Sequence, residues 1–157
     1  MARRTIGTVG WALRGAAAGA AGTTALNVVT YLDMALRGRP ASTTPQRTVE
    51  RLAETAHVSI PGQGERRAAR VEGLGALTGL VAGAGVGGLF GLGRAAGFRA
   101  GTLLTTVAVL VSTNGPMTVL GVTDPRTWSR TDWLSDLVPH LAYGAVVATT
   151  MDAFDRG

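Results

Sequence analysis

One helical face near the end of the chain carries several groups that could do acid–base chemistry. Residues at spacings of three and four share a helix face, and this pattern joins Asp132, Asp136, His140, Tyr143 and Val147. Ionisable groups at membrane depth are costly, so they are default candidates for proton or ion paths. We therefore interpret Asp136 and His140 as a candidate protonatable pair, with Tyr143 as a further polar group on their face.

Two asparagines in other apolar stretches extend this set of polar candidates. Asn114 comes just before Gly115 and Pro116, and Asn27 lies between Thr23 and Thr30. Proline lacks an amide donor and leaves a helix carbonyl without its partner, and transporters place binding sites at such interrupted helices. The alternative is that these side chains join helices by hydrogen bonds of about 0.6 kcal/mol each.

The elements that position these residues are predicted from the places where charges are missing. Four runs contain no Asp, Glu, Lys or Arg: Gly15 to Leu32 (18 residues), Gly73 to Gly93 (21), Ala100 to Thr123 (24) and Leu137 to Met151 (15). Crossing the hydrocarbon core takes about 20 helical residues. The runs predict transmembrane helices over about 9–33, 71–93, 100–122 and 133–152, with Arg14 and Asp136 tolerated inside the first and the fourth.

This pattern gives the predicted fold class. We expect one all-α membrane domain over residues 1–157, a four-helix transmembrane bundle built of two helical hairpins. A soluble helical domain with buried helices is the alternative. A second alternative takes Arg3 and Arg4 as the start of a signal peptide, against which Arg14 interrupts the apolar stretch.

The polar connection between the first two spans predicts a short amphipathic helix over about 45–58. Thr44 can cap it, Pro45 can occupy its first position, and Pro61-Gly62 can end it. Basic residues near a membrane surface attract anionic lipids, and three of them directly precede the second span: Arg66, Arg67 and Arg70. The expected partners are therefore the lipid bilayer and, at these arginines, anionic lipids.

Glycines recur every fourth residue along the second span and form a stripe without side chains. The stripe consists of Gly75, Gly79, Gly83, Gly87 and Gly91, and a shorter one on the first span holds Gly15, Gly19 and Gly22. Such stripes let helix backbones approach closely in lipid. We interpret them as helix-packing surfaces within one chain, and association into a homo-oligomer is the alternative.

Composition excludes several classes of function. Only 16% of the 157 residues are charged, where a soluble domain carries about a quarter. There is no cysteine, which excludes disulfides and thiolate nucleophiles, and two distant histidines make a poor metal site. The motifs of serine hydrolases, zinc proteases and P-loop enzymes are absent from the sequence. We therefore predict no enzyme, no metal and no cofactor, and we do not interpret the basic composition as a nucleic-acid signal.

Two segments resemble known bacterial membrane proteins. The segment from Thr24 through Asp33 and Arg39-Pro40 to Ala53 resembles a group of uncharacterised actinobacterial membrane proteins. The end of the chain, from Asp124-Pro125 through His140 to Asp152, is distantly similar to the YagU-like bacterial inner-membrane family, whose last span carries an acidic residue and a histidine. The resemblance implies a multi-pass protein of the bacterial plasma membrane.

The functional prediction is a small integral membrane protein of structural or interaction type, without catalysis. The main alternative is a proton-coupled or solute-conducting protein that uses Asp136, His140 and Asn114. A membrane lipid-modifying enzyme is a third hypothesis.

Overall fold

The computed structural model describes residues 6–156 and contains no strand in that range. The elements are α1 (Thr8–Arg37), α2 (Thr44–Thr55), α3 (Gly64–Ala95), α4 (Thr102–Val119), a 3-10 turn η1 (Pro125–Thr127) and α5 (Arg130–Arg156). The all-α prediction is confirmed. Arg3 and Arg4, on which the signal-peptide alternative rests, lie outside the described residues.

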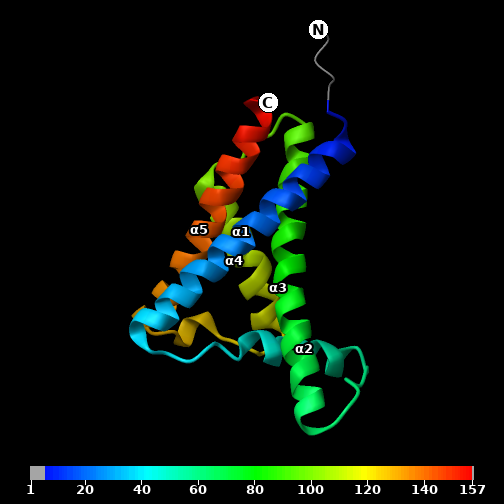
Figure 1. The fold of residues 1–157 in the computed structure, drawn as a ribbon, viewed down its shortest axis with the longest axis vertical. Coiled ribbons are helices and arrows are strands. Elements are labelled where there is room, and N and C mark those ends of the chain that lie inside the picture. Colours follow the sequence, from blue (N-terminus) through cyan, green and yellow to red (C-terminus); the bar gives the residue numbers. More distant parts are fainter. Residues whose placement is uncertain (1–5, 157) are drawn as a thin grey trace.

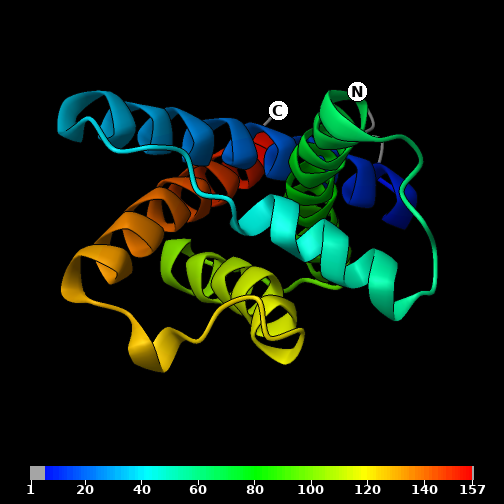
Figure 2. The same ribbon diagram turned by 90° about the horizontal axis from the view of Figure 1, so that it is seen from below.

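Four long helices alternate in direction along the bundle. In Figure 1, α1 runs away from the end where both termini lie, α3 returns, α4 runs away again, and α5 returns. The view from below in Figure 2 shows α5 between α1 and α4, with α2 lying across the end opposite the termini. The chain thus forms two antiparallel helix pairs, α1 with α3 and α4 with α5.

Two of the helices, α3 and α4, are long and apolar enough to cross a membrane. The other two long helices, α1 and α5, fall below that level of apolarity. These helices carry many of the polar residues that prompted the site prediction, among them Asn27 and His140.

Local capping explains where several helices begin and end. Ser129 and Asp132 form a reciprocal capping box at the start of α5, with Ser129 Oγ 2.7 Å from the Asp132 carboxylate and 3.2 Å from the Asp132 amide. The prediction that Thr44 caps α2 is wrong by one position. The N-cap is Thr43, and Ser42 Oγ accepts the Thr44 amide at 3.2 Å.

The second helix also ends earlier than the expected stop at Pro61-Gly62. Its last residue is Thr55, and His57 takes a left-handed conformation with φ of 55°. The amide of His57 donates to Glu54, and that of Val58 to Ala53. These two bonds form the helix-ending motif that usually has glycine at the left-handed position.

The glycine stripe of α3 packs against α1 over only part of its length. A methyl group on Gly87 would lie 2.7 Å from Cα of Gly19, and one on Gly15 would lie 2.8 Å from Cα of Gly91. Gly83 faces Thr23 of α1 in the same row. The α1–α3 contact is therefore backbone against backbone, as glycine stripes permit.

The remaining two stripe residues lie elsewhere. A methyl on Gly75 would lie 3.2 Å from Pro45 of α2, whereas one on Gly79 would meet no atom within 4 Å. Sequence reasoning missed Gly144, whose methyl would lie 2.9 Å from the Thr106 amide and which brings α5 against α4. Side chains of the central core pack around these contacts: Ala18, Val86, Val109, Tyr143, Val147 and Met151.

Candidate functional site

A polar pocket of about 460 Å³ lies at the end of the bundle opposite the termini. Its walls come from the last turns of α1, the α1–α2 connection, the last turns of α4 and the first turns of α5. The ionisable and amide side chains that line it are Arg37, Arg39, Asn114, Asp132, Asp136 and His140. Three of the five predicted polar candidates, Asn114, Asp136 and His140, therefore meet here.

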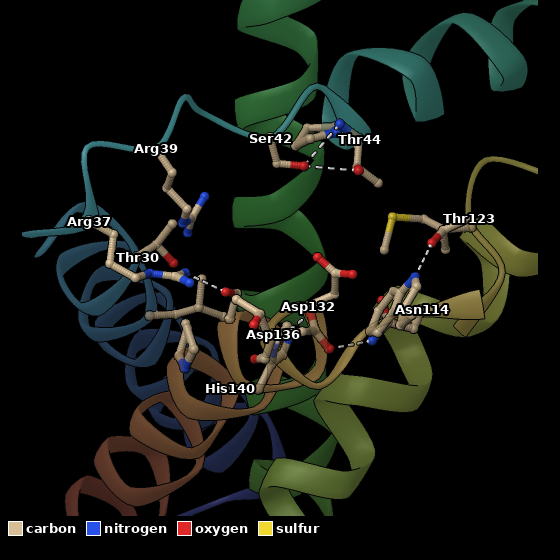
Figure 3. Close-up of a pocket in the computed structure, with 17 residues that line it drawn as sticks. Thr30, Arg37, Arg39, Ser42, Thr44, Asn114, Thr123, Asp132, Asp136 and His140 are labelled. Atoms are coloured by element: carbon tan, nitrogen blue, oxygen red, sulfur yellow. Dashed lines mark hydrogen bonds and ion pairs between the residues drawn. The ribbon is translucent and has the colours of Figure 1, made fainter. Parts of the chain in front are cut away.

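These three residues are joined by hydrogen bonds between α4 and α5. Asn114 Nδ2 donates to Asp136 Oδ2 at 2.8 Å, a bond that Figure 3 shows as a dashed line. His140 Nδ1 lies 2.7 Å from the backbone oxygen of Asp136 and 3.4 Å from its Oδ1. His140 Nε2 lies 3.3 Å from Thr113 Oγ1. The pocket thus has a continuous polar wall that leads inward to a histidine only 8% exposed.

The contacts of His140 fix the position of one ring proton. Nδ1 faces only oxygen acceptors, so it carries a proton. Thr113 Oγ1 lies between Nε2 and the Val109 carbonyl, from which it is 2.9 Å away. The imidazole ring therefore joins Asp136 on its own helix to Thr113 on α4.

The prolines near the site do not interrupt their helices. α4 continues through Pro116 to Val119, and α5 runs through Pro139, which is buried. The expected interruption near the membrane midplane is therefore wrong. Pro116 lies in the last turn of α4, where a missing amide disturbs little of the helix, and Asn114 lies in the last third of α4 rather than at its centre.

A cluster of charges that sequence reasoning missed forms another wall. Arg37 and Arg39 each lie 2.5 Å from Asp33 Oδ2. Arg37 also donates to Ser135 Oγ at 2.5 Å, which joins the end of α1 to the start of α5. The sequence signal that could have indicated this cluster is the pair of arginines that follows the charge-free run 15–32. Because Ser135 bonds Arg37 and not His140, these residues do not form a serine–histidine pair.

The other two polar candidates do not reach the pocket. Asn27 is exposed on α1 and is not part of the pocket wall. Tyr143 is fully buried, and its hydroxyl donates to the Gly83 carbonyl of α3 at 2.6 Å. The predicted face of α5 therefore serves two purposes, a pocket at Asp136 and His140 and helix packing at Tyr143.

Beyond His140 the interior is closely packed and holds two buried threonines, Thr105 and Thr106. The tightest packing is at Val109, Tyr143 and Val147, which are at most 2% exposed. At the far end, Arg94 pairs with Asp152 and with Asp155, the latter at 2.7 Å. The pocket thus ends blind at a layer of packed side chains.

Arg14 packs inside the same far end. Its guanidinium stacks between the rings of Trp11 and Phe154 at 5.6 and 5.4 Å, and it donates to the Phe154 carbonyl at 3.3 Å. This contact caps the C-terminal end of α5 and gives the charge within α1 a partner.

The three arginines at the start of α3 differ in their contacts. Arg67 pairs with Glu50 of α2 at 2.7 Å, and Arg70 donates to the Pro61 carbonyl at 2.7 Å. Arg66 is exposed. Anionic-lipid binding at these arginines stays a prediction, with two of them already holding the α2 segment.

Within residues 6–156, no three His, Asp or Glu side chains are grouped so that they could hold a metal ion.

In comparisons with known proteins, no family model, curated protein or solved structure matches this chain. The resemblance to YagU-like proteins thus stays a prediction, and the functional argument rests on the site.

Proposed function

We propose that this chain is a four-span protein of the bacterial plasma membrane that binds a polar ligand in a pocket open to one face of the membrane. The observation that carries the membrane assignment is a surface of large apolar side chains on all four long helices. Examples with more than half of their surface exposed are Val28 and Leu32 on α1, Leu77 and Val81 on α3, Leu103 and Val107 on α4, and Leu134 on α5. Apolar surfaces this extensive mark membrane or protein contacts.

Two further features support spanning by α1 and α5. Each contains a charge-free run, 15–32 and 137–151, and each is long enough at about 1.5 Å per residue to cross a 30 Å hydrocarbon core. Charged side chains inside or beside these runs are partnered, as Arg14 is with Phe154 and Asp136 is with Asn114. Partnering of this kind is what charges at membrane depth need.

The blind end of the pocket supports binding rather than conduction. A conducting path would need a continuous polar route between His140 and the Arg94 end, and the side chains there are closely packed, with Val109 and Val147 at most 2% exposed. The buried hydroxyls of Thr105 and Thr106 are bonded to backbone carbonyls one turn earlier. Packing of the Gly83–Gly91 row against α1 likewise supports an intramolecular role for the stripe. We therefore favour an interaction protein without catalysis.

The absence of native cysteine allows a direct test by single-cysteine labelling. We would make Thr30→Cys and Asn114→Cys in the pocket, Thr106→Cys in the closed core, and Ser42→Cys and Thr127→Cys as loop controls. Each purified variant is placed in phosphatidylcholine liposomes and treated with a small membrane-impermeant thiol reagent. We expect the pocket positions to react like the loop controls and Thr106→Cys to stay unreacted, because Thr106 is 3% exposed.

Two results would overturn the proposal. If Thr30→Cys and Asn114→Cys stay unreacted while the loop controls react, the polar wall is dry and serves only to pack helices. If Thr106→Cys reacts as well, water crosses the core and a conducting protein is the better assignment.

Conduction is the second candidate, and the pairing of a carboxylate and an imidazole favours it, since Asp136 Oδ1 and His140 Nδ1 lie 3.4 Å apart and a small side-chain movement brings them within proton-transfer distance. It predicts proton flux into liposomes that His140→Ala and Asp136→Asn abolish. Flux that neither substitution changes would remove this relay.

A further inference from the structure

The polar pocket adjoins a second hollow on the outside of the bundle. This groove, of about 360 Å³, lies between α1 and α5. Its apolar lining comes from Val29, Leu134 and Val138, and Asp33 lies at its edge. Four residues belong to both hollows: Arg37, Thr131, Ser135 and Pro139. Arg37 and Ser135, which line both hollows, are hydrogen-bonded to each other, so a single ligand with a polar and an apolar part would occupy both hollows by lying across or displacing this bond.

The groove faces the surface that the proposed membrane embedding gives to lipid. Leu134 is 59% exposed and Val138 is 48% exposed. On the same stretch of α1, Val28 and Leu32 are exposed. In the proposed membrane embedding, lipid acyl chains always contact this surface, whereas a soluble polar ligand would leave the apolar groove empty.

The pocket walls carry charges of both signs in separate places. Figure 3 shows Arg37 and Arg39 on the α1 side, Asn114 on the α4 side, and Asp132 and Asp136 between them. Arg37 is bonded to Asp33 and to Ser135, and Asp132 lies close enough for its charge to attract that of Arg37. A ligand with an anion and a cation a few ångströms apart matches this separation.

We propose that the pocket and the groove together hold one phospholipid with a phosphoethanolamine headgroup. The phosphate lies against Arg37, the primary ammonium lies against Asp132 and Asp136, and one acyl chain lies along Val138 between α1 and α5. This inference rests on the proposed membrane embedding and names the ligand of the same pocket.

The chemistry of the headgroup separates ethanolamine from the other common lipids. A primary ammonium donates three hydrogen bonds to carboxylates, which the quaternary ammonium of choline cannot do. A glycerol headgroup has no cation, so its phosphate would face the carboxylates of Asp132 and Asp136 without compensation. Retention should therefore fall in the order ethanolamine, choline, glycerol.

The test measures which lipid stays bound to the purified, intact protein. The protein is equilibrated with equal amounts of phosphatidylethanolamine, phosphatidylcholine and phosphatidylglycerol and examined by native mass spectrometry. We expect ethanolamine lipid to be retained about tenfold over glycerol lipid, the factor that one charge-assisted hydrogen bond supplies. Asp136→Asn should remove that preference.

Matched variants separate the site from general charge effects. Asp124→Asn makes the same charge change at a loop carboxylate paired with Arg126 and outside the pocket, so the preference should stay. Val138→Trp fills the groove and leaves every charge in place, and it should lower retention of all three lipids. Equal retention of the three lipids by the parent protein, or an unchanged preference in Asp136→Asn, would overturn the assignment.

The labelling experiment distinguishes failure of this inference from failure of the proposed function. If Thr30→Cys reacts in phosphatidylcholine liposomes and added phosphatidylethanolamine slows the reaction, both proposals are supported. If it reacts at the same rate with and without that lipid, the pocket stands and the lipid assignment is wrong. If it reacts in neither, the pocket itself is wrong.

Discussion

Substitution of Gly87 by alanine tests whether the α1–α3 contact holds the bundle together. The added methyl group would lie 2.7 Å from both the Cα and the amide nitrogen of Gly19, where ordinary contact begins at 3.4 Å. The Gly15 carbonyl oxygen would lie closer still, so the two helices must move apart by more than about 0.7 Å at this point. Both partners at the contact are backbone, so no side chain can rotate away to relieve the overlap.

Gly79→Ala is the matched control, since its methyl would meet no atom within 4 Å. Both substitutions gain the same helix propensity, up to about 1 kcal/mol for Gly to Ala, so this gain cancels in the comparison. What remains is the overpacking at Gly87, which typically costs about 1–3 kcal/mol. We expect Gly87→Ala to be less stable than Gly79→Ala by that amount.

The measurement is unfolding of each variant by SDS titration in mixed micelles, followed by tryptophan fluorescence. Trp11 lies at this contact, with its backbone against Gly91, and replacing Trp128 and Trp133 by phenylalanine in both variants assigns the fluorescence to Trp11. Equal unfolding midpoints for the two variants would refute the close α1–α3 contact. A change in molecular mass for Gly87→Ala alone, measured in micelles, would show that the stripe joins separate chains.

Three further predictions concern single contacts. Tyr143→Phe removes the bond to the Gly83 carbonyl and should lower the free energy of unfolding by about 0.6–1 kcal/mol. Ser129 lowers the pKa of Asp132 below its ordinary value of 3.8 through its hydroxyl and its amide. The charged carboxylate therefore stabilises the start of α5 above pH 3.8, and this stability is lost as the pH falls through the lowered pKa. Ser129→Ala should raise the pKa of Asp132 toward 3.8, which carboxyl-carbon NMR measures, so that the loss of stability begins at a higher pH. Arg94→Gln removes the cation that pairs with two aspartates and should lower the free energy of unfolding by roughly 1–3 kcal/mol, below the cost for a fully buried pair.

Each of these predictions has a control: two make the same chemical change at an exposed residue, and the third follows a second carboxylate in the same variant. Tyr31→Phe, at a ring 62% exposed, should leave the unfolding midpoint unchanged. Arg51→Gln breaks only the exposed pair with Glu54 and should cost less than about 0.5 kcal/mol. For the titration, the pKa of Asp124, which Arg126 lowers, should stay the same in Ser129→Ala. A control that shifts as far as its test variant would contradict the contact in question.

Local signals in the sequence predicted local structure well. The charge-free runs located the four long helices, and Pro45 with the amphipathic pattern after it located the short helix that follows α1. Such features depend on residues within a few positions of one another. The end of α2 was missed because a histidine, not the usual glycine, takes the left-handed position.

The pocket was predicted in part, because part of it lies on one helix. Asp136 and His140 are one turn apart on α5, so helical spacing alone brings them together. The Arg37–Ser135 bond joins residues about a hundred positions apart and depends on how α1 leans across the bundle. No periodic pattern within either segment contains that information.

The lean of α1 also explains why Asn27 lies outside the pocket and why Gly79 does not pack against α1. Along the α1–α3 contact, Gly15 lies against Gly87 and Gly91, and Gly19 against Gly83 and Gly87. One turn further Thr23 still faces Gly83, and two turns further the same antiparallel register would place Asn27 near Gly79, but Asn27 is exposed and a methyl on Gly79 would meet no atom within 4 Å. Helices that cross at an angle stay in contact for only a few turns, although a stripe with a period of four continues along the whole helix.

Separation of α1 from α3 beyond Gly83 makes room for the site. In Figure 1, α1 crosses α3 in the half of the bundle that holds the termini and then leans toward the start of α5. Arg37 at the end of α1 reaches Ser135 there. α2 packs on the part of α3 that α1 has left, with Pro45 against Gly75. A bundle with α1 and α3 in contact over their whole length would leave Arg37 far from Ser135. The close glycine contact at one end of the bundle and the pocket at the other end therefore follow from one crossing.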